Sequence, residues 1–176
     1  MTLNFVPEYY FQTFDEASSD FLKSKGICGI ILDVDNTLEP YENAKPGESV
    51  LVWFNSLRAA GISFAIVSNN NGERIKLFAE GLNIPIYYKA KKPFAKNVLN
   101  AMHDMGTTKD NSLLMGDQVF TDVWAAHNAG ISAILVPPIK DKKDIFTKFK
   151  RLLEKPILNK YYKKLRKNKA ENERAE

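Results

Sequence analysis

The sequence contains little cysteine and no long apolar run. Cys28 is the single cysteine among 176 residues, which excludes an intramolecular disulfide and a cysteine-rich metal centre and fits a reducing compartment. No stretch approaches the roughly 20 apolar residues that a membrane-spanning helix needs. No lysine or arginine precedes Lys23 and no apolar run follows Met1, so the N-terminus lacks the pattern of a signal peptide. These absences predict a cytoplasmic protein.

Excess negative charge is absent from the end of the chain. Residues 140–176 carry 14 Lys or Arg against 6 Asp or Glu, a balance of +8, whereas residues 1–139 have a balance of −4. Hydrophobic residues make up 44% and charged residues 26% of the chain, which excludes wholesale disorder. We expect an acidic folded core followed by a basic tail. The tail is either a solvated appendage or a surface for an anionic partner, phospholipid or RNA.

Short apolar runs alternate with segments of helical spacing through the middle of the chain. Strands are predicted at 27–32, 62–67, 85–88, 112–115 and 131–136. Helices are predicted at 16–25, 47–60, 73–80, 94–105 and 121–128, the fourth of them started by Pro93. Strands separated by single helices form right-handed βαβ units. The pattern therefore predicts an α/β fold, a Rossmann-like parallel sheet flanked by helices.

Polar side chains follow four of the predicted strands. They are Asp33, Asp35, Ser68, Asn69, Lys92, Asp117 and Asp122. In parallel α/β sheets the ligand crevice lies beyond the carboxyl ends of the strands. Because successive groups are separated by about one strand and one helix, we expect them to converge at that edge.

The chemistry of this set indicates phosphoryl transfer. Several aspartates in one crevice repel one another, so a cation must neutralise them. Without histidine or cysteine among them, a hard ion that prefers oxygen is favoured, and Mg²⁺ is the usual one where phosphate is handled. Asp33 can be a nucleophile while Asp35 gives and takes a proton. Each element alone is common on loops, but the ordered set at four strand ends is specific.

At these residues the sequence resembles the haloacid dehalogenase (HAD) superfamily of phosphatases, over residues 27–136. The four family motifs are matched by Asp33–Thr37, Ser68, Lys92, and Gly116-Asp117 with Asp122. More narrowly, the segments ILDVDNTL, VSNNN, KKP and GDQVFTD resemble the YqeG-type phosphatases of subfamily IIIA. Those proteins are similar to the phosphatidylglycerophosphate phosphatases of mitochondria and plastids.

The resemblance implies a role for each residue. It makes Asp33 the nucleophile that forms an aspartyl-phosphate, and Asp35 the acid that protonates the leaving group and then activates water. The implied phosphate ligands are Ser68, Asn69 and Lys92, with Lys91 as the neighbouring alternative to Lys92. The implied Mg²⁺ ligands are the Asp33 carboxylate, the Asp35 backbone carbonyl and Asp117. Asp122 is implied to orient Lys92 or a metal-bound water.

The spacing of the motifs leaves no room for the cap domain that many members of this superfamily carry. Leu38–Pro46 has only nine residues, and one helix and one strand fill the interval between the second and third motifs. We therefore predict a capless HAD-like fold. Its open crevice suits a large substrate: a lipid headgroup, a protein or a nucleic-acid end.

Three segments are expected: an aromatic-rich N-terminal segment with a short helix at 1–25, a phosphatase core at 26–139, and a basic helical tail at 140–176. The N-terminal segment is expected to cover a sheet edge, the alternative being a contact with a bilayer or partner. After Pro156, Ile157, Leu158, Tyr161 and Leu165 share one helical face among lysines, as in an interfacial basic helix. Packing of this face on the core or on a second subunit is the alternative.

The sequence thus predicts a Mg²⁺-dependent phosphomonoester hydrolase that acts through an aspartyl-phosphate, with phosphatidylglycerophosphate as the favoured substrate. We expect the protein in the cytoplasm, at the inner face of a membrane that bears anionic phospholipid. The alternatives are a phosphatase of another large substrate and an RNA- or ribosome-associated binding protein with vestigial hydrolase activity. A phosphorylated receiver module is disfavoured because it does not require Asp35.

Overall fold

Six parallel strands form a single sheet in the computed structural model, which describes residues 4–140 and 155–163. The strands are β1 (Tyr9–Tyr10), β2 (Gly29–Leu32), β3 (Ser63–Val67), β4 (Ile86–Tyr87), β5 (Ser112–Gly116) and β6 (Ser132–Leu135). Their order across the sheet is β1-β6-β5-β2-β3-β4. The order reverses at the central strand β2, between β5 and β3. Such a reversal opens a crevice at the carboxyl ends of the strands.

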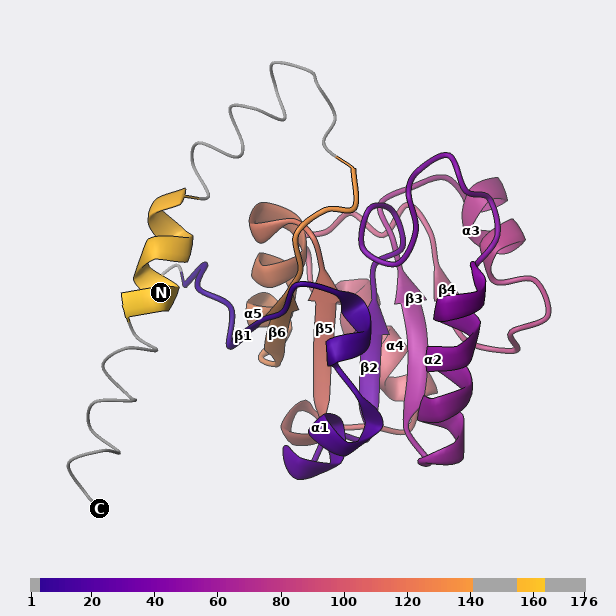
Figure 1. The fold of residues 1–176 in the computed structure, drawn as a ribbon, viewed down its shortest axis with the longest axis horizontal. Helices are drawn as coiled ribbons and strands as arrows, with labels where there is room; N and C mark the ends of the chain where they lie inside the picture. The colour runs from indigo at the N-terminus through magenta and orange to yellow at the C-terminus, as the bar shows by residue number, and fades with distance from the viewer. Residues whose placement is uncertain (1–3, 141–154, 164–176) are drawn as a thin grey trace.

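Helices cover both faces of the sheet (Figure 1). The helices are α1 (Ser19–Ser24), α2 (Glu48–Ala59), α3 (Gly72–Phe78), α4 (Lys96–Asp104) and α5 (Trp124–Ala129). Side chains of α1, α2 and α3 join one apolar cluster, and those of α4 and α5 join a second cluster on the opposite face. Two 3₁₀ turns, Phe14–Glu16 and Lys109–Asn111, and a π-helical turn, Val119–Val123, complete the core.

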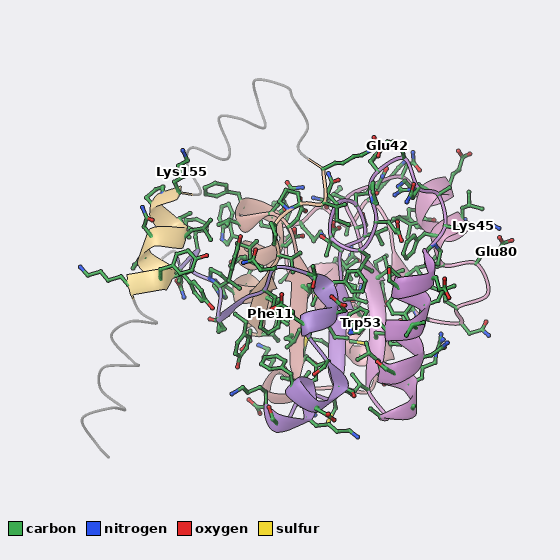
Figure 2. The ribbon with its side chains drawn as sticks, in the orientation of Figure 1. Phe11, Glu42, Lys45, Trp53, Glu80 and Lys155 are labelled. Carbon is green, nitrogen blue, oxygen red and sulfur yellow. The ribbon has the colours of Figure 1, made fainter. Side chains whose placement is uncertain are left out.

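Burial on both faces explains why the central strands are apolar runs. All four residues of β2 are buried, as parallel strands between two helical layers require. On one face the ring of Phe54 from α2 stacks on Phe64 of β3 at 4.5 Å between centroids. The neighbouring Trp53 donates its indole N–H to the carbonyl of Ala17 at 3.0 Å, which ties the N-terminal segment to α2 (Figure 2).

The predicted parallel α/β fold is confirmed, with differences at helix starts. The helix predicted from residue 94 begins at Lys96, because the residues around the cis Lys92–Pro93 peptide form a turn closed by the Phe94 N–H on the Lys91 carbonyl, 3.0 Å. The helix predicted at 121–128 is a π turn followed by α5. The helix predicted from residue 16 begins at Ser19, where the Ser18 side chain accepts the N–H of Phe21.

Both flanks of the core meet at one edge of the sheet. Strand β1, which was not predicted as a strand, pairs in parallel with β6, placing Tyr10 beside Leu135. Residues 155–163 are helical and lie beside β1 (Figure 1). In this helix Tyr161 is buried, and its hydroxyl accepts the Tyr10 N–H at 3.0 Å. Part of the predicted apolar face of the tail therefore packs on the core, while Leu165 lies outside the described residues.

The described chain contains no inserted cap and no helix long and apolar enough to cross a membrane. A single loop joins β2 to α2, and α3 alone separates β3 from β4. Within residues 4–140 and 155–163, no second domain covers the carboxyl edge of the sheet, as predicted.

Candidate active site

The carboxyl ends of the strands bring the predicted residues together. Asp33 follows β2, Ser68 follows β3, Lys92 follows the short β4 and Asp117 follows β5. A pocket of about 250 Å³ opens at this edge. It is lined by Asp33, Asp35, Ser68, Asn69, Asn70, Lys92, Gln118, Thr121 and Asp122. Every candidate except Asp117 lines it directly.

Lys92 lies at the base of the site between two carboxylates. Its Nζ is 2.7 Å from Asp33 Oδ1 and 2.6 Å from Asp122 Oδ1, and its side chain is only 2% exposed. Although burial by itself lowers the pKa of Lys92, the carboxylates of Asp122 and Asp33 raise it above its usual value. The lysine therefore stays protonated and supplies a fixed positive charge beside Asp33. Lys91, its sequence neighbour, is exposed and does not line the pocket.

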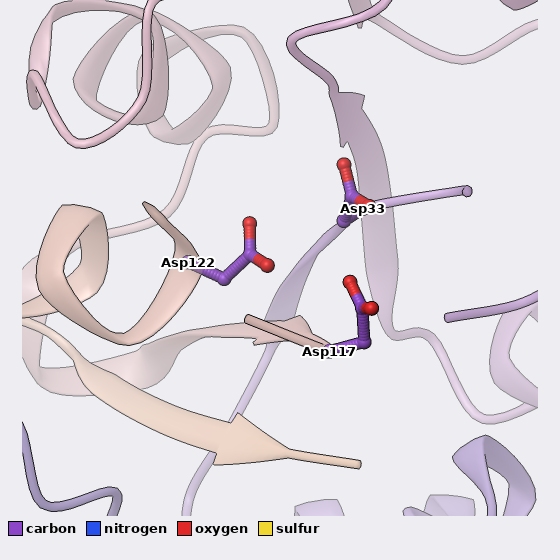
Figure 3. A group of neighbouring side chains, drawn as sticks. All are labelled: Asp33, Asp117 and Asp122. Carbon is purple, nitrogen blue, oxygen red and sulfur yellow. The ribbon is translucent and has the colours of Figure 1, made fainter. Parts of the chain in front are cut away.

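The carboxylates of three buried aspartates lie close together (Figure 3). Ligand oxygens of Asp33, Asp117 and Asp122 all lie within 4.8 Å of one another. Burial raises the pKa of Asp33 to about 6, a rise that Lys92 opposes and Asp122 increases. Burial, together with the charges of Asp122 and Asp33, raises the pKa of Asp117 well above its usual value. These raised pKa values reflect burial and the presence of more carboxylates than the single Lys92 ammonium can neutralise.

The donor set fits a hard divalent cation. Asp117 Oδ1 is fully buried and has no hydrogen-bond partner among the described residues. A buried, unpartnered carboxylate oxygen is costly unless a cation or a water meets it. The three aspartates offer only oxygen ligands, which Mg²⁺ prefers, and a cation would also relieve their mutual repulsion. Asp33 and Asp117 are the residues best placed to hold it.

Asp35, only two residues from Asp33, has a different environment. Its Oδ1 accepts Arg74 Nε at 2.6 Å and its Oδ2 accepts Asn70 Nδ2 at 2.6 Å. The same guanidinium donates to the carbonyls of Asn43 at 2.5 Å and Pro40 at 3.2 Å. Arg74 therefore fixes the Asp35 carboxylate to both α3 and the loop that follows β2.

The second motif positions the third. Asn69 was a candidate phosphate ligand, and it lines the pocket. Its side-chain Nδ2 donates to the Lys92 carbonyl at 3.1 Å and its Oδ1 accepts the Lys92 N–H at 2.7 Å. The backbone N–H of Ser68 donates to the Tyr87 carbonyl at 2.8 Å, and the Ser68 hydroxyl oxygen accepts the Asn70 N–H at 3.2 Å. The loops after β3 and β4 are thus joined directly under the pocket.

A glycine allows Asp122 to reach the site. Asp122 Oδ2 accepts the Gln118 N–H at 3.0 Å, which folds its side chain back over the end of β5. A Cβ on Gly116 would overlap the Cβ, Cγ and Oδ2 atoms of Asp122. The glycine of the fourth motif therefore serves close packing beneath the carboxylate.

Sequence reasoning missed Gln118 and Thr121, which line the pocket, and three residues that support the site. Arg74 and Asn70 hold Asp35. The buried Glu39 accepts the Gly47 N–H and Asn43 Nδ2, each at 2.7 Å, and so braces the loop after β2. Asn70 stands in the same asparagine run as Asn69 and could have been included from it. Arg74 and Glu39 carry no such signal, because their partners are set by how α3 and this loop pack.

The sequence comparisons identify relatives of this chain. The sequence model described as "Haloacid dehalogenase-like hydrolase" matches residues 12–136. A Bacillus subtilis (strain 168) protein named "Probable phosphatase YqeG" is 36% identical over 155 residues, covering 88% of this chain and 90% of the relative. The Arabidopsis thaliana "Phosphatidylglycerophosphate phosphatase 1, chloroplastic/mitochondrial" is 26% identical over 163 residues. That match covers 82% of this chain but only 44% of the longer plant protein.

Solved structures share the fold at low identity. The 3-deoxy-D-manno-octulosonate 8-phosphate phosphatase from Moraxella catarrhalis, in complex with magnesium and phosphate ions and a KDO molecule, aligns with a TM-score of 0.53 at 16% identity. It covers 88% of this chain and 98% of its own. The cobalt-bound enzyme from Haemophilus influenzae gives a TM-score of 0.53 at 17% identity, over 79% of this chain and 93% of its own.

Proposed function

Because this chain belongs to the haloacid dehalogenase-like hydrolase family and is a phosphatase of that family, we propose that it hydrolyses phosphomonoesters with Mg²⁺ through an aspartyl-phosphate on Asp33. One observation carries the proposal. The Asp33 carboxylate lies in an open pocket, 2.7 Å from the buried Lys92 ammonium and beside the unpartnered carboxylate oxygen of Asp117. A nucleophile, a fixed cation and a metal-type oxygen set therefore meet at one point.

The metal belongs to the proposal. Asp33, Asp117 and the backbone carbonyl of Asp35 would hold Mg²⁺, and Asp122 would orient Lys92 from the opposite side. When bound, the ion supplies positive charge to phosphoryl oxygens and keeps Asp33 ionised at neutral pH. A magnesium ion in the Moraxella relative is consistent with this assignment.

The residues of the chain account for both halves of the reaction. Asp33 attacks phosphorus in line, and the bond from phosphorus to the ester oxygen breaks as Asp35 gives that oxygen a proton. Water then attacks the phosphorus of the aspartyl-phosphate while Asp35 takes its proton, releasing inorganic phosphate and restoring the Asp33 carboxylate. Lys92, with the backbone around Ser68, stabilises charge on the phosphoryl oxygens throughout.

The substrate we propose is a phosphatidylglycerophosphate-type lipid. The pocket of about 250 Å³ accommodates a phosphate and a few neighbouring atoms, so the bulk of any large substrate must remain outside. The absence of a cap in the described chain leaves room for that bulk, and the plant relative is named for this substrate. Another large phosphomonoester is the second candidate. The intact charged set disfavours an RNA-binding role with vestigial hydrolysis.

Turnover of p-nitrophenyl phosphate and of phosphatidylglycerophosphate in mixed micelles, with and without Mg²⁺, tests the proposal. Asp33→Asn should lower kcat by several powers of ten, since it removes the nucleophile. The matched control, Asp110→Asn, replaces an exposed aspartate at the opposite edge and should retain wild-type rates. Hydrolysis by Asp33→Asn at the rate of the control would refute the mechanism, and hydrolysis of other esters alone would refute the lipid assignment.

The role of Asp35 has a separate test. Asp35→Asn should still take phosphate onto Asp33 from a substrate with a good leaving group, but should release it slowly. The variant should therefore accumulate a phosphoenzyme that hydroxylamine cleaves. Wild-type turnover of a poor leaving group by Asp35→Asn would show that another residue supplies the proton.

A further inference from the structure

Loops around the pocket expose large apolar side chains, whereas the other exposed large apolar residues of the described chain lie on helices. Among the described loops, large exposed apolar residues occur only in those that follow strand ends at the catalytic edge: Tyr41, Tyr88, Phe94 and Ile139. Phe94, two residues after Lys92, is 69% exposed, more than any other large apolar residue of the described chain. All four lie at the edge of the sheet that carries the pocket, and Phe94 protrudes furthest into solvent.

Positive charge accompanies Phe94. We call residues 88–96 the rim loop; its lysines at 89, 91 and 96 are all exposed, and none forms an ion pair with a described carboxylate. No Asp or Glu occurs anywhere between residues 81 and 103. The rim loop therefore combines a protruding aromatic ring with uncompensated cations, which is complementary to an anionic apolar interface.

The rim loop is anchored to the catalytic residues. The backbone N–H of Lys89 donates to the Asn70 carbonyl at 2.8 Å, and that of Ala90 donates to the Ser68 carbonyl at 3.0 Å. On the other side, Asn128 Nδ2 donates to the Pro93 carbonyl at 2.9 Å. Lys92, within the loop, contacts Asp33 directly. A ligand bound by the rim loop would therefore be held at a fixed position relative to Asp33.

We propose that the rim loop is the membrane-contact element of this enzyme: Phe94 enters the interface of an anionic phospholipid bilayer while the flanking lysines bind its headgroups. This inference rests on the proposed function and adds the surface by which a lipid-borne phosphomonoester is presented. The pocket takes only the phosphate end of such a substrate, so its acyl chains stay in the bilayer beside Phe94. The site assigned here is separate from the basic tail, which lies at the β1 edge of the sheet where it is described.

A position-specific reporter tests the contact in the full-length protein. The tryptophan fluorescence of the Phe94→Trp variant should be quenched by brominated acyl chains in phosphatidylcholine/phosphatidylglycerol vesicles, more than that of Trp53 and Trp124 in the wild type. Addition of 0.5 M NaCl should weaken this quenching. Phosphatidylcholine vesicles alone should quench it little. Val52→Trp is the control, because Val52 is 63% exposed but lies on α2. Equal quenching at both positions, or none at position 94, would overturn the proposal.

Activity gives an independent readout. The triple variant Phe94→Ser, Lys89→Ala, Lys96→Ala should lose about tenfold in rate on vesicle-borne phosphatidylglycerophosphate, since each lysine near an anionic bilayer and the apolar insertion add to binding. Its rate on p-nitrophenyl phosphate should stay at the wild-type level. Val52→Ser with Lys23→Ala and Lys25→Ala removes equivalent exposed groups elsewhere and should change neither rate.

The outcomes separate the two proposals. A wild-type enzyme inactive on every phosphate ester would refute the proposed function, whereas quenching at position 94 would still report membrane contact. If the wild type is active and the triple variant keeps its full rate on vesicles, the membrane-contact role of the rim loop is refuted while the proposed function stands. Binding of single-stranded RNA that depends on the rim loop, without binding to vesicles, would assign the surface to a nucleic acid and overturn the lipid proposal.

Discussion

The two edges of the sheet are built by different means. At the amino edge, the turns that lead into β2 to β6 each use a glycine with positive φ: Gly26, Gly61, Gly81, Gly106 and Gly130. Glycine adopts this backbone without strain, so a short turn can end a helix through its own N–H groups. At the carboxyl edge the positive φ values fall on side-chain-bearing residues, Asn36, Lys89 and Lys91, whereas at the amino edge Asn83, in the turn before β4, is the single such residue of the described chain.

Buried polarity follows the same division. The described chain buries eight polar or charged side chains, and seven lie at the carboxyl edge; the exception is Ser112 at the start of β5. Charges buried in this way lower stability unless they are paired. The amino edge is therefore arranged for folding, whereas the carboxyl edge holds buried polar and charged groups at a cost in stability.

Loss of Lys92 should break this arrangement most severely. Lys92→Met leaves Asp33 and Asp122 buried without their shared cation, so we expect kcat to fall by about three powers of ten, the scale for losing a fixed group that stabilises developing charge. Removing one member of a buried ion pair also costs about 3 kcal/mol of unfolding free energy. Steady-state kinetics with Mg²⁺ measure the first effect and urea unfolding without Mg²⁺ the second, with the exposed Lys91→Met as control. Equal losses in both variants would contradict the assignment.

A pair of glycine substitutions compares the edges directly. Gly116→Ala should push Asp122 away from Lys92 and lower kcat/KM by about 100-fold, the scale of a misplacement of about 1 Å. Gly61→Ala, at φ +75° with open space around the new Cβ, should cost about 1 kcal/mol of stability through backbone strain and leave kcat unchanged. Chemical unfolding and steady-state kinetics on both proteins would show the opposite pattern if the division were wrong.

Arg74 offers a subtler change at the carboxyl edge. Arg74→Met removes one of the two groups that hold Asp35, so proton transfer should suffer while the nucleophile remains. We expect about a tenfold lower kcat on an alkyl phosphate and a smaller loss on p-nitrophenyl phosphate, whose leaving group needs little protonation. Arg58→Met, an α2 arginine bonded to the Leu82 carbonyl, is the control. Equal losses on the two substrates would assign Arg74 a purely structural role.

The sequence predicts most of the sheet because the central strands are buried on both faces. Strands β2, β3, β5 and β6 lie within two residues of their predicted limits, since each is an apolar run ended by a turn residue. Strand β1 has only two residues, and its pairing with β6 joins segments 125 residues apart. No local pattern signals such an edge strand. The start of α4 was misplaced because Pro93 fits a first helical turn as well as it fits the turn observed.

The convergence of the candidate site residues is predictable for a topological reason. Parallel strands end at one edge, so polar residues immediately after them must lie near one another, as Asp33 and Lys92 do. Contacts that depend on side-chain reach escape this reasoning. Arg74 meets Asp35 across 39 residues, and His127 meets Glu8 across 119.

The smallest predicted effect concerns the Glu8–His127 pair, which fastens β1 to the core. Glu8 Oε2 lies 3.2 Å from His127 Nε2 and accepts the Ala133 N–H at 2.8 Å. Burial alone would raise the pKa of Glu8, but His127 and the Ala133 N–H hold it below the usual 4.5. The hydrogen bond to Glu8 raises the pKa of His127 above 6.5, against a smaller opposing effect of burial.

The sign of each shift fixes the pH at which this attachment is strongest. The contribution of His127 is complete below pH 6.5 and disappears as pH rises through its raised pKa; that of Glu8 is complete above pH 4.5 and disappears as pH falls through its lowered pKa. Both act together between these values. The free energy of unfolding of the wild type should therefore fall between pH 6 and pH 8, by no more than about 1 kcal/mol because the pair is partly exposed. The His127→Gln variant should show no such fall. Urea unfolding at both pH values measures it. His103→Gln, which alters the only other histidine at a 90% exposed side chain, should retain the wild-type pH dependence. If His103→Gln also abolished the fall in stability between pH 6 and pH 8, the group responsible for the pH dependence would not be His127.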